Sequence, residues 1–304
     1  MNKKILAYIM LVMKCILYGI SILFTGKLLE AGGTFEILAF RFTMSAVVFL
    51  LLRTLGIIKI NFKGKNLKPL FFAALFEPVL YFIFETLGIK YTSTITAGII
   101  LALLPIVAGA AEMLILKEKT NTKQKLFMLL GIIGALVIVF WSEQNGADSI
   151  MGILFMVIAM VSGGFFLATS RKSSEEFSTM EITYFMAWTG AIAFNVINFG
   201  INVFNGTLST YFALLADPTN VAQLAFLAIV CSIVATSMGN FALSEIQAST
   251  VSTIGGLTTV VTVLSGVFVK NEQFTLYHLI GMICILASAV GVAYVKESKK
   301  KILK

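Results

Sequence analysis

The sequence is poor in charge and contains little proline, cysteine or histidine. Of its 304 residues, only 12% are Asp, Glu, Lys or Arg, about half of the ~25% usual in soluble domains. Hydrophobic residues make up 58% of the chain, which is more apolar surface than a soluble fold can hide from water. These proportions exclude a soluble enzyme, a disordered chain and a fibrous protein, and they indicate a polytopic membrane protein.

The few cysteines and the single histidine exclude several kinds of chemistry. Cys15, Cys231 and Cys284 all fall inside apolar runs, which favours small core residues over a disulfide framework. One histidine, His278, provides no metal-ligand set, and the chain lacks H-E-x-x-H, G-x-S-x-G and Walker A sequences. We predict no cofactor, no metal and no enzyme activity. A membrane-embedded lipid-modifying enzyme is the remote alternative, and a channel or non-transporting sensor is a further one.

What the sequence does contain is a series of long apolar stretches. A helix needs roughly 20 apolar residues to cross the hydrocarbon core, and strands of a membrane barrel would instead alternate over ~10 residues. We therefore predict an all-α integral membrane protein with ten transmembrane helices at about 5–25, 35–53, 69–87, 94–116, 125–142, 151–170, 181–203, 222–243, 250–269 and 275–295.

The placement of positive charge predicts the orientation. With both the N-terminus and the C-terminus cytoplasmic, the cytoplasmic segments hold 18 Lys and Arg residues and the external loops hold only Lys27, Lys90 and Lys270. Such an excess is the positive-inside signal, and it accounts for the net charge of +8 without any nucleic-acid partner. Lys14 interrupts the first stretch and no cleavage-site pattern follows it, so we expect a retained helix rather than a signal peptide.

The ten helices divide into two groups of five at the polar stretch 142–148. An odd number of helices in each half places the second half in the opposite orientation, which is the condition for an inverted repeat. A shift of 154 residues aligns Glu118 with Glu272 and Thr96 with Thr250. We predict a first repeat at 1–145 and a second at 146–304. Inverted repeats favour a secondary transporter with a central site.

Six short segments of the chain carry a recognisable pattern: Ala39–Phe42, Leu87–Ser93, Leu103–Pro105, Leu116–Lys119, Ala248–Ser252 and Val269–Glu272. These segments resemble the EamA-like ten-helix family of the drug/metabolite transporter superfamily. The resemblance covers both halves, but Thr259 stands where a second proline would match Pro105, so no proline break is expected in helix nine.

The resemblance implies a ten-helix bundle around a central cavity. In such a bundle, helices one, three, four, six, eight and nine would line the cavity. Helices five and ten would pack at the periphery and are often implicated in dimer contacts. Helices five and ten here also carry small residues four apart, Gly131 with Ala135 and Ala287 with Gly291, which permit close approach. These pairs suit either a homodimer contact or internal packing.

Glu77 is the leading candidate site residue. It lies near the middle of the third stretch, where a charge costs about 2.5–3.5 kcal/mol on insertion scales, and Pro78 follows it. Pro78 cannot donate to the carbonyl of residue 74, so we expect a helix break beside the carboxylate. A carboxyl group away from water favours its neutral form. Glu77 would suit proton coupling or a cationic substrate, and the alternative is a structural ion pair with Lys14 or Arg41.

Other polar residues in the first half are weaker candidates. Glu85 lies two turns beyond Glu77, with Tyr81 between them on nearly the same face, and Glu112 follows a second expected break at Pro105. Lys14 would bind a substrate carboxylate or neutralise Glu77, and Tyr18 is one turn away. For Arg41 we favour a structural role, either reaching outward to the interface or held by a partner.

The second half has no charge near the middle of its helices, but it offers neutral polar groups. Asn195, Asn198 and Asn202 share one face of the seventh stretch, and Asn240 lies in the eighth. Such residues either line a cavity or hydrogen-bond between helices. We include Asn195 and Asn240 among the candidates for substrate binding. An acidic half facing a neutral polar half would suit an amphipathic or zwitterionic substrate.

Together these features predict a secondary transporter in the cytoplasmic membrane. It would move small organic metabolites, such as amino acids, or drugs by alternating access, with efflux favoured and proton coupling through Glu77 as a hypothesis. An uptake permease or an uncoupled exchanger is the alternative. The expected partners are the small-molecule substrate and the lipid bilayer.

Overall fold

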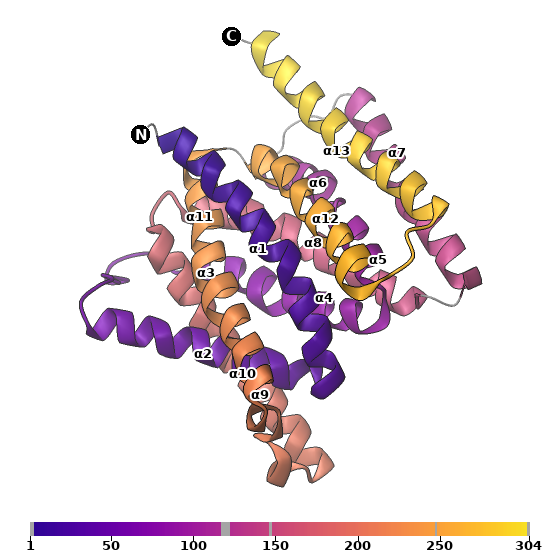
Figure 1. Ribbon diagram of the computed structural model, residues 1–304. Helices are drawn as coiled ribbons and strands as arrows, with labels where there is room; N and C mark the ends of the chain where they lie inside the picture. The colour runs from indigo at the N-terminus through magenta and orange to yellow at the C-terminus, as the bar shows by residue number, and fades with distance from the viewer. Residues whose placement is uncertain (1–2, 117–121, 146–147, 247, 303–304) are drawn as a thin grey trace.

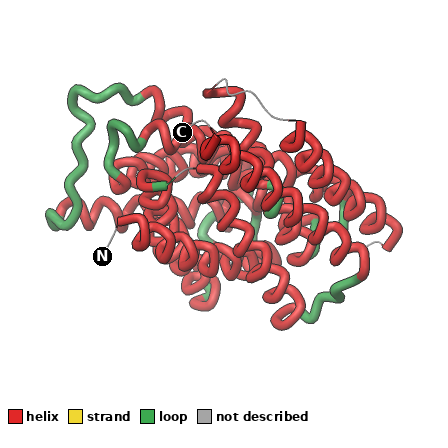
Figure 2. Tube along the Cα trace, turned by 90° about the horizontal axis from the view of Figure 1, so that it is seen from above, coloured by secondary structure: helices red, strands yellow, loops and turns green. Residues whose placement is uncertain are grey.

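The computed structural model describes residues 3–116, 122–145, 148–246 and 248–302, and these contain helices and loops without a strand (Figures 1 and 2). The helices are α1 (Lys3–Ala31), α2 (Thr34–Thr54), α3 (Lys68–Ala74), η1 (Leu75–Leu80), α4 (Tyr81–Tyr91), α5 (Thr94–Leu101), α6 (Leu104–Leu116), α7 (Thr122–Asn145), α8 (Ile150–Ser173), α9 (Thr179–Asn205), η2 (Leu208–Thr210), η3 (Ala213–Ala216), α10 (Pro218–Ala225), η4 (Phe226–Ala235), α11 (Thr236–Glu245), α12 (Ala248–Lys270) and α13 (Leu276–Ile302).

The hydropathy of these helices confirms a multi-pass membrane protein. In the described ranges, seven helical runs are long and apolar enough to cross a membrane, and shorter apolar helices occupy Leu126–Ile138, Ile254–Lys270 and Leu276–Ser288. All ten predicted stretches fall within helical runs. Because three of them meet the criterion only as shorter helices, crossing of the membrane ten times stays a prediction.

The two halves of the chain interleave. The most extensive helix contacts include four pairs that each join the first half to the second: α7 with α13, α2 with α9, α1 with α12, and α4 with α8. In Figure 1, α1 begins and α13 ends at the upper end of the molecule, and α7 and α13 run side by side at one edge. The space at the centre is therefore enclosed by helices from both halves.

Two prolines interrupt helices in the first half, as the sequence predicts. Glu77 has non-helical backbone angles, φ −143° and ψ 120°, just before Pro78 within the π-helical segment η1. The next interruption separates α5 from α6 at residues 102–103, directly before Leu104 and Pro105. Proline provides no backbone N–H to the preceding turn, which accounts for both breaks. In the second half, α12 continues as a helix through Thr259, which confirms that the break is missing there.

Small residues hold α7 and α13 together. A Cβ added at Gly134 would lie 2.8 Å from Cys284 Cβ and 2.9 Å from the Gly281 carbonyl oxygen, and one added at Gly131 would lie 2.7 Å from Ser288 Oγ. The two backbones thus approach as closely as glycine permits. Internal packing accounts for Gly131, and a homodimer contact through these helices stays a prediction.

We expect Gly134→Ala to destabilise the protein. An added methyl group would overlap α13, and overpacking of this kind costs about 1–3 kcal/mol. The matched control is Gly200→Ala on α9, where nothing lies within 4 Å of the added Cβ and alanine is the better helix former. Thermal unfolding in detergent should show a lower midpoint for the first variant and an unchanged or higher midpoint for the control. Equal midpoints would show that α7 and α13 are not closely packed.

Candidate functional site

The central cavity lies between helices of both halves. Side chains of α1, η1, α4, the α5–α6 segment, α8 and α12 line it, and its volume is about 70 Å³, room for a few waters at ~30 Å³ each. These correspond to five of the six helices that the family resemblance implies. The sixth implied helix is the eighth predicted stretch, 222–243, which contains part of α11. It contributes none of the lining side chains but packs directly behind them. The lining residues include Leu11, Lys14, Cys15, Tyr18, Ile22, Glu77, Tyr81, Glu85, Leu104, Gly163, Phe166, Leu167, Val251 and Thr258.

Two carboxylates stand on one wall of the cavity. Glu77 is 6% exposed and Glu85 is 5% exposed. The Tyr81 hydroxyl donates to Glu85 Oε1 at 2.8 Å, whereas no hydrogen bond reaches the Glu77 carboxylate from any described residue. The non-helical backbone at Glu77 turns this residue out of the regular helix. Glu77 is therefore the carboxylate that is free to take a proton or a ligand.

A cation occupies another part of the wall. Lys14 lies over the Tyr18 ring, with its Nζ 5.1 Å from the ring centroid. The side chain also passes Gly239 of α11, where an added Cβ would lie 2.7 Å from Nζ. Lys14 and Glu77 interact electrostatically. The only ion pair within 4.0 Å in the described ranges, however, joins Lys65 to Glu181.

This geometry bears on both interpretations of Glu77. In the described part of the chain no ion pair within 4.0 Å joins Glu77 to Lys14 or Arg41, although both cations interact with it electrostatically, so its role stays a prediction. The charges instead surround the cavity at a distance. A ligand between Lys14 and Glu77 would meet a cation on one side and a carboxylate on the other.

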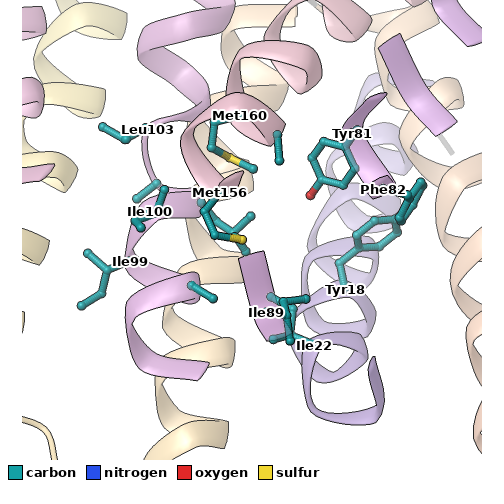
Figure 3. Close-up of a cluster of buried hydrophobic side chains, with 14 of the residues drawn as sticks. Tyr18, Ile22, Tyr81, Phe82, Ile89, Ile99, Ile100, Leu103, Met156 and Met160 are labelled. Carbon is teal, nitrogen blue, oxygen red and sulfur yellow. The ribbon is translucent and has the colours of Figure 1, made fainter. Parts of the chain in front are cut away.

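Two tyrosines belong to the polar lining. The Tyr18 and Thr236 hydroxyls are 2.7 Å apart, which fixes α1 against α11. Figure 3 shows Tyr18 and Tyr81 together with Phe82 in a buried cluster, which also includes Met156 and Met160 of α8. Both tyrosines are buried and pack within a mostly apolar cluster. Such a wall suits the apolar part of a small ligand.

Arg41 differs from the expectation that it reaches outward. It is only 2% exposed, its Nε donates to Ser232 Oγ at 2.9 Å, and its guanidinium carbon lies 4.4 Å from the centre of the Phe82 ring. Apolar neighbours thus enclose it inside the bundle. The prediction that it is held by a partner is confirmed in Ser232, and the prediction of an outward-reaching side chain is wrong.

Asn195 and Asn240 lie away from the central cavity. Asn195 Nδ2 donates to Thr43 Oγ1 at 2.6 Å and joins α9 to α2. Asn240 accepts from Ser170 and donates to Thr183, at 3.0 Å each, and so joins α11 to α8 and α9. Neither residue lines the cavity. Their contacts match the other interpretation of such residues, namely hydrogen bonding between helices.

The side chain of Glu112 lies outside the described residues, although its backbone belongs to α6. Glu118 lies outside them as well. Among the described residues no group of three or more His, Cys, Asp or Glu side chains could hold a metal ion. The described site therefore consists of two carboxylates, one ammonium, two phenols, the Thr258 hydroxyl and the Cys15 thiol among apolar side chains.

Sequence reasoning missed the apolar residues that line the cavity. Phe166 and Leu167 of α8 and Val251 of α12 face it, but nothing distinguishes them in the sequence from the many apolar residues that face lipid. Gly163 gives a usable signal, because a Cβ there would lie 3.2 Å from the Tyr81 ring. A glycine in an apolar helix thus marked the position where α8 approaches the site.

Comparison with known proteins agrees with this architecture. The EamA-like transporter family matches residues 5–140 and 150–294. The chain is 31% identical over 299 residues to the uncharacterized transporter YcxC of Bacillus subtilis (strain 168), covering 97% of this chain and 95% of that protein. It is 23% identical over 313 residues to the uncharacterized transporter YetK of the same strain, covering 99% and 89%.

A solved crystal structure has the same fold. It superposes with a TM-score of 0.61 over 95% of this chain and 98% of that chain, at 14% sequence identity. At this identity the similarity shows the fold alone.

Proposed function

Because the chain belongs to the EamA-like transporter family, we propose that it is a secondary carrier of small zwitterionic metabolites such as amino acids. The charges of the central cavity support this substrate class. A zwitterion would place its carboxylate near Lys14 and its ammonium near Glu77, and the apolar lining would receive its side chain. Each buried charge would then gain an opposite charge from the ligand, which is what makes burial of a charge tolerable.

We further propose alternating access by two inverted five-helix repeats, 1–145 and 146–304, in the cytoplasmic membrane. Ten crossings would place both chain ends in the cytoplasm. In Figure 1 the start of α1 and the end of α13 lie at the same end of the molecule, which supports placing both chain ends on one side of the membrane. At about 70 Å³ the cavity is below the ~300–1,000 Å³ of typical ligand pockets. Substrate entry therefore requires the surrounding helices to part.

Export coupled to proton entry is the direction that we propose, with Glu77 as the proton carrier. A carboxylate in the cavity without a hydrogen bond from the described residues can alternate between proton and substrate ammonium. One group then links the two fluxes, because binding of either excludes the other.

Counterflow in proteoliposomes tests the carrier. Vesicles loaded with pooled unlabelled amino acids should accumulate labelled amino acid transiently, which a carrier shows and an enzyme, channel or sensor does not. Lys14→Met should raise the apparent KM for zwitterions by about tenfold or more, a loss of ~1.4 kcal/mol. Lys27→Met is the matched control, because Lys27 lies on the same helix and is exposed.

The outcomes separate the alternatives. If Lys14→Met shows counterflow with the wild-type KM, the substrate is not a zwitterion bound through Lys14. The substrate class would then be a cationic amine, which needs only the two carboxylates. Absence of counterflow with pools of amino acids, amines and sugars alike would contradict a carrier for these substrates.

A further inference from the structure

A second cavity opens where α7 ends and α13 begins. Its volume is about 800 Å³, within the ~300–1,000 Å³ of ligand sites and far larger than the central cavity. Among the described residues the two cavities share no lining side chain. This cavity is therefore a separate space that the carrier mechanism does not use.

The long walls of this second cavity are apolar and come from two helices. Val137 and Trp141 are one turn apart on α7, and Leu276 and Ile280 are one turn apart on α13. This spacing places each pair on a single helix face. The cavity thus runs as a groove between two apolar ridges.

In a membrane that α7 and α13 cross as proposed, the groove faces lipid rather than water. Beyond it on the same helices, Ile133, Phe140 and Ile283 are 53%, 61% and 56% exposed. In a membrane protein, large apolar side chains with this exposure contact acyl chains. Trp141 and Tyr277 line the groove near the ends of their helices, a position that aromatic residues favour at the boundary between acyl chains and headgroups.

One end of the groove is acidic. Glu272 lines it, and its carboxylate accepts from the backbone N–H groups of Thr94 at 3.0 Å and Ile95 at 2.9 Å. A carboxylate has about four acceptor positions, so further donors can bind. In the described part of the chain no Lys or Arg lines the groove.

The neutral polar residues Ser93, Gln273, Thr275 and His278 also line this cavity, and His278 is already engaged. His278 Nδ1 is 2.9 Å from Thr275 Oγ1, its Nε2 is 3.3 Å from Thr96 Oγ1, and the ring is 3% exposed. Asp148 accepts from Thr96 Oγ1 at 2.6 Å and adds a second negative charge behind the wall. The acidic end is therefore complementary to a cation.

We propose that this groove binds a phospholipid whose headgroup carries an ammonium, such as phosphatidylethanolamine. The ammonium lies at Glu272 and beside the Trp141 and Tyr277 rings, whose faces attract cations. An acyl chain lies between the α7 and α13 ridges and continues along their exposed apolar faces. The size, the apolar walls and the single charged end together fit an amphiphile rather than a compact metabolite.

Native mass spectrometry of the detergent-purified chain tests this assignment. Phosphatidylethanolamine and phosphatidylglycerol with identical acyl chains are titrated separately. We expect the wild type to bind phosphatidylethanolamine about tenfold more tightly. Ile280→Trp, which fills the groove, should remove this preference, and Ile192→Trp, at an exposed position on α9, should keep it. Val137→Trp fills the groove from the opposite wall and replaces Ile280→Trp if that variant does not fold.

Three results would overturn the proposal. Equal binding of the two lipids would remove the ammonium as the recognised group. An unchanged preference in a folded groove-filling variant would place the lipid elsewhere. Displacement of the lipid by free ethanolamine at equal concentration would assign the groove to small amines. The experiment involves no transport, so its failure and that of the proposed carrier are independent.

Discussion

Replacing Glu77 with glutamine is expected to abolish proton movement while leaving substrate exchange in place. Glutamine keeps the size and polarity of the side chain but cannot bind or release a proton. Because no described residue donates to the Glu77 carboxylate, the substitution leaves no broken hydrogen bond there. Substrate would then be held by Lys14 and Glu85 alone, so the apparent KM for exchange should rise as the ammonium loses Glu77. The coupled flux should fall to the level of empty vesicles, and counterflow should continue.

Proton flux in proteoliposomes that contain a pH-sensitive dye measures this directly. Wild type, Glu77→Gln and Glu30→Gln are challenged with pools of amino acids, polyamines, sugars and cationic drugs. Glu30 is an exposed carboxylate on α1, so its variant controls for the loss of one negative charge. Accumulation of substrate against its gradient by Glu77→Gln would show that the proton is carried elsewhere or that another ion drives transport.

Glu85 provides the internal comparison for this prediction. It lines the same cavity, but the Tyr81 hydroxyl holds one of its oxygens. Glutamine at this position would weaken the Tyr81 contact and remove the charge that attracts a substrate ammonium, whereas the Glu77 carboxylate would still be present to carry the proton. Glu85→Gln should therefore impair substrate affinity more than proton coupling. If Glu85→Gln instead lost proton coupling and Glu77→Gln lost substrate affinity, Glu85 would be the proton carrier and Glu77 the substrate-binding group.

The sequence singled out charged residues of the first half because charge in an apolar helix is rare and costly. Lys14, Glu77 and Glu85 stand out for this reason, and all three line one cavity. The backbone breaks near Pro78 and Pro105 were equally predictable, since proline chemistry is local. These features depend on single residues and short spacings, which a sequence displays directly.

The second half could not be predicted in the same way. Asn195 and Asn240 have the residue type and the spacing of a cavity wall, yet both hydrogen-bond between helices. Which face of a membrane helix points to a cavity depends on its rotation against its neighbours. That rotation is decided by close packing across the whole bundle, such as the contact between Gly134 and Gly281. The burial of Arg41 could not be predicted for the same reason, because it depends on how the neighbouring helices pack around the side chain.

Arg41 carries a buried charge that the structure leaves partly unsatisfied. Its Nε bonds to Ser232, but its Nη2 has no hydrogen-bond partner among the described residues. A guanidinium keeps its proton even when buried, so a permanent positive charge sits behind the cavity wall. It interacts electrostatically with both Glu77 and Glu85. With Lys14, it balances the two carboxylates.

We expect Arg41→Gln to destabilise the protein by about 3 kcal/mol, since breaking a buried charge arrangement leaves an uncompensated charge. The double variant Arg41→Gln with Glu85→Gln should recover more than ~1 kcal/mol of this loss, because interacting residues are not additive. Arg53→Gln is the control: Arg53 lies at the exposed end of the same helix and donates to the Tyr184 hydroxyl at 3.2 Å. Thermal unfolding in detergent measures five proteins: wild type, Arg41→Gln, Glu85→Gln, the double variant and the Arg53→Gln control.

The double-variant cycle distinguishes charge balance from simple packing. If Arg41 acts only by filling space beside Phe82, the losses in the single variants should add, and Glu85→Gln should not rescue the protein. If charge balance decides, the neutral pair should fold nearly as well as wild type but bind a zwitterion less tightly. The buried arginine would then be the group that allows two carboxylates to face one small cavity.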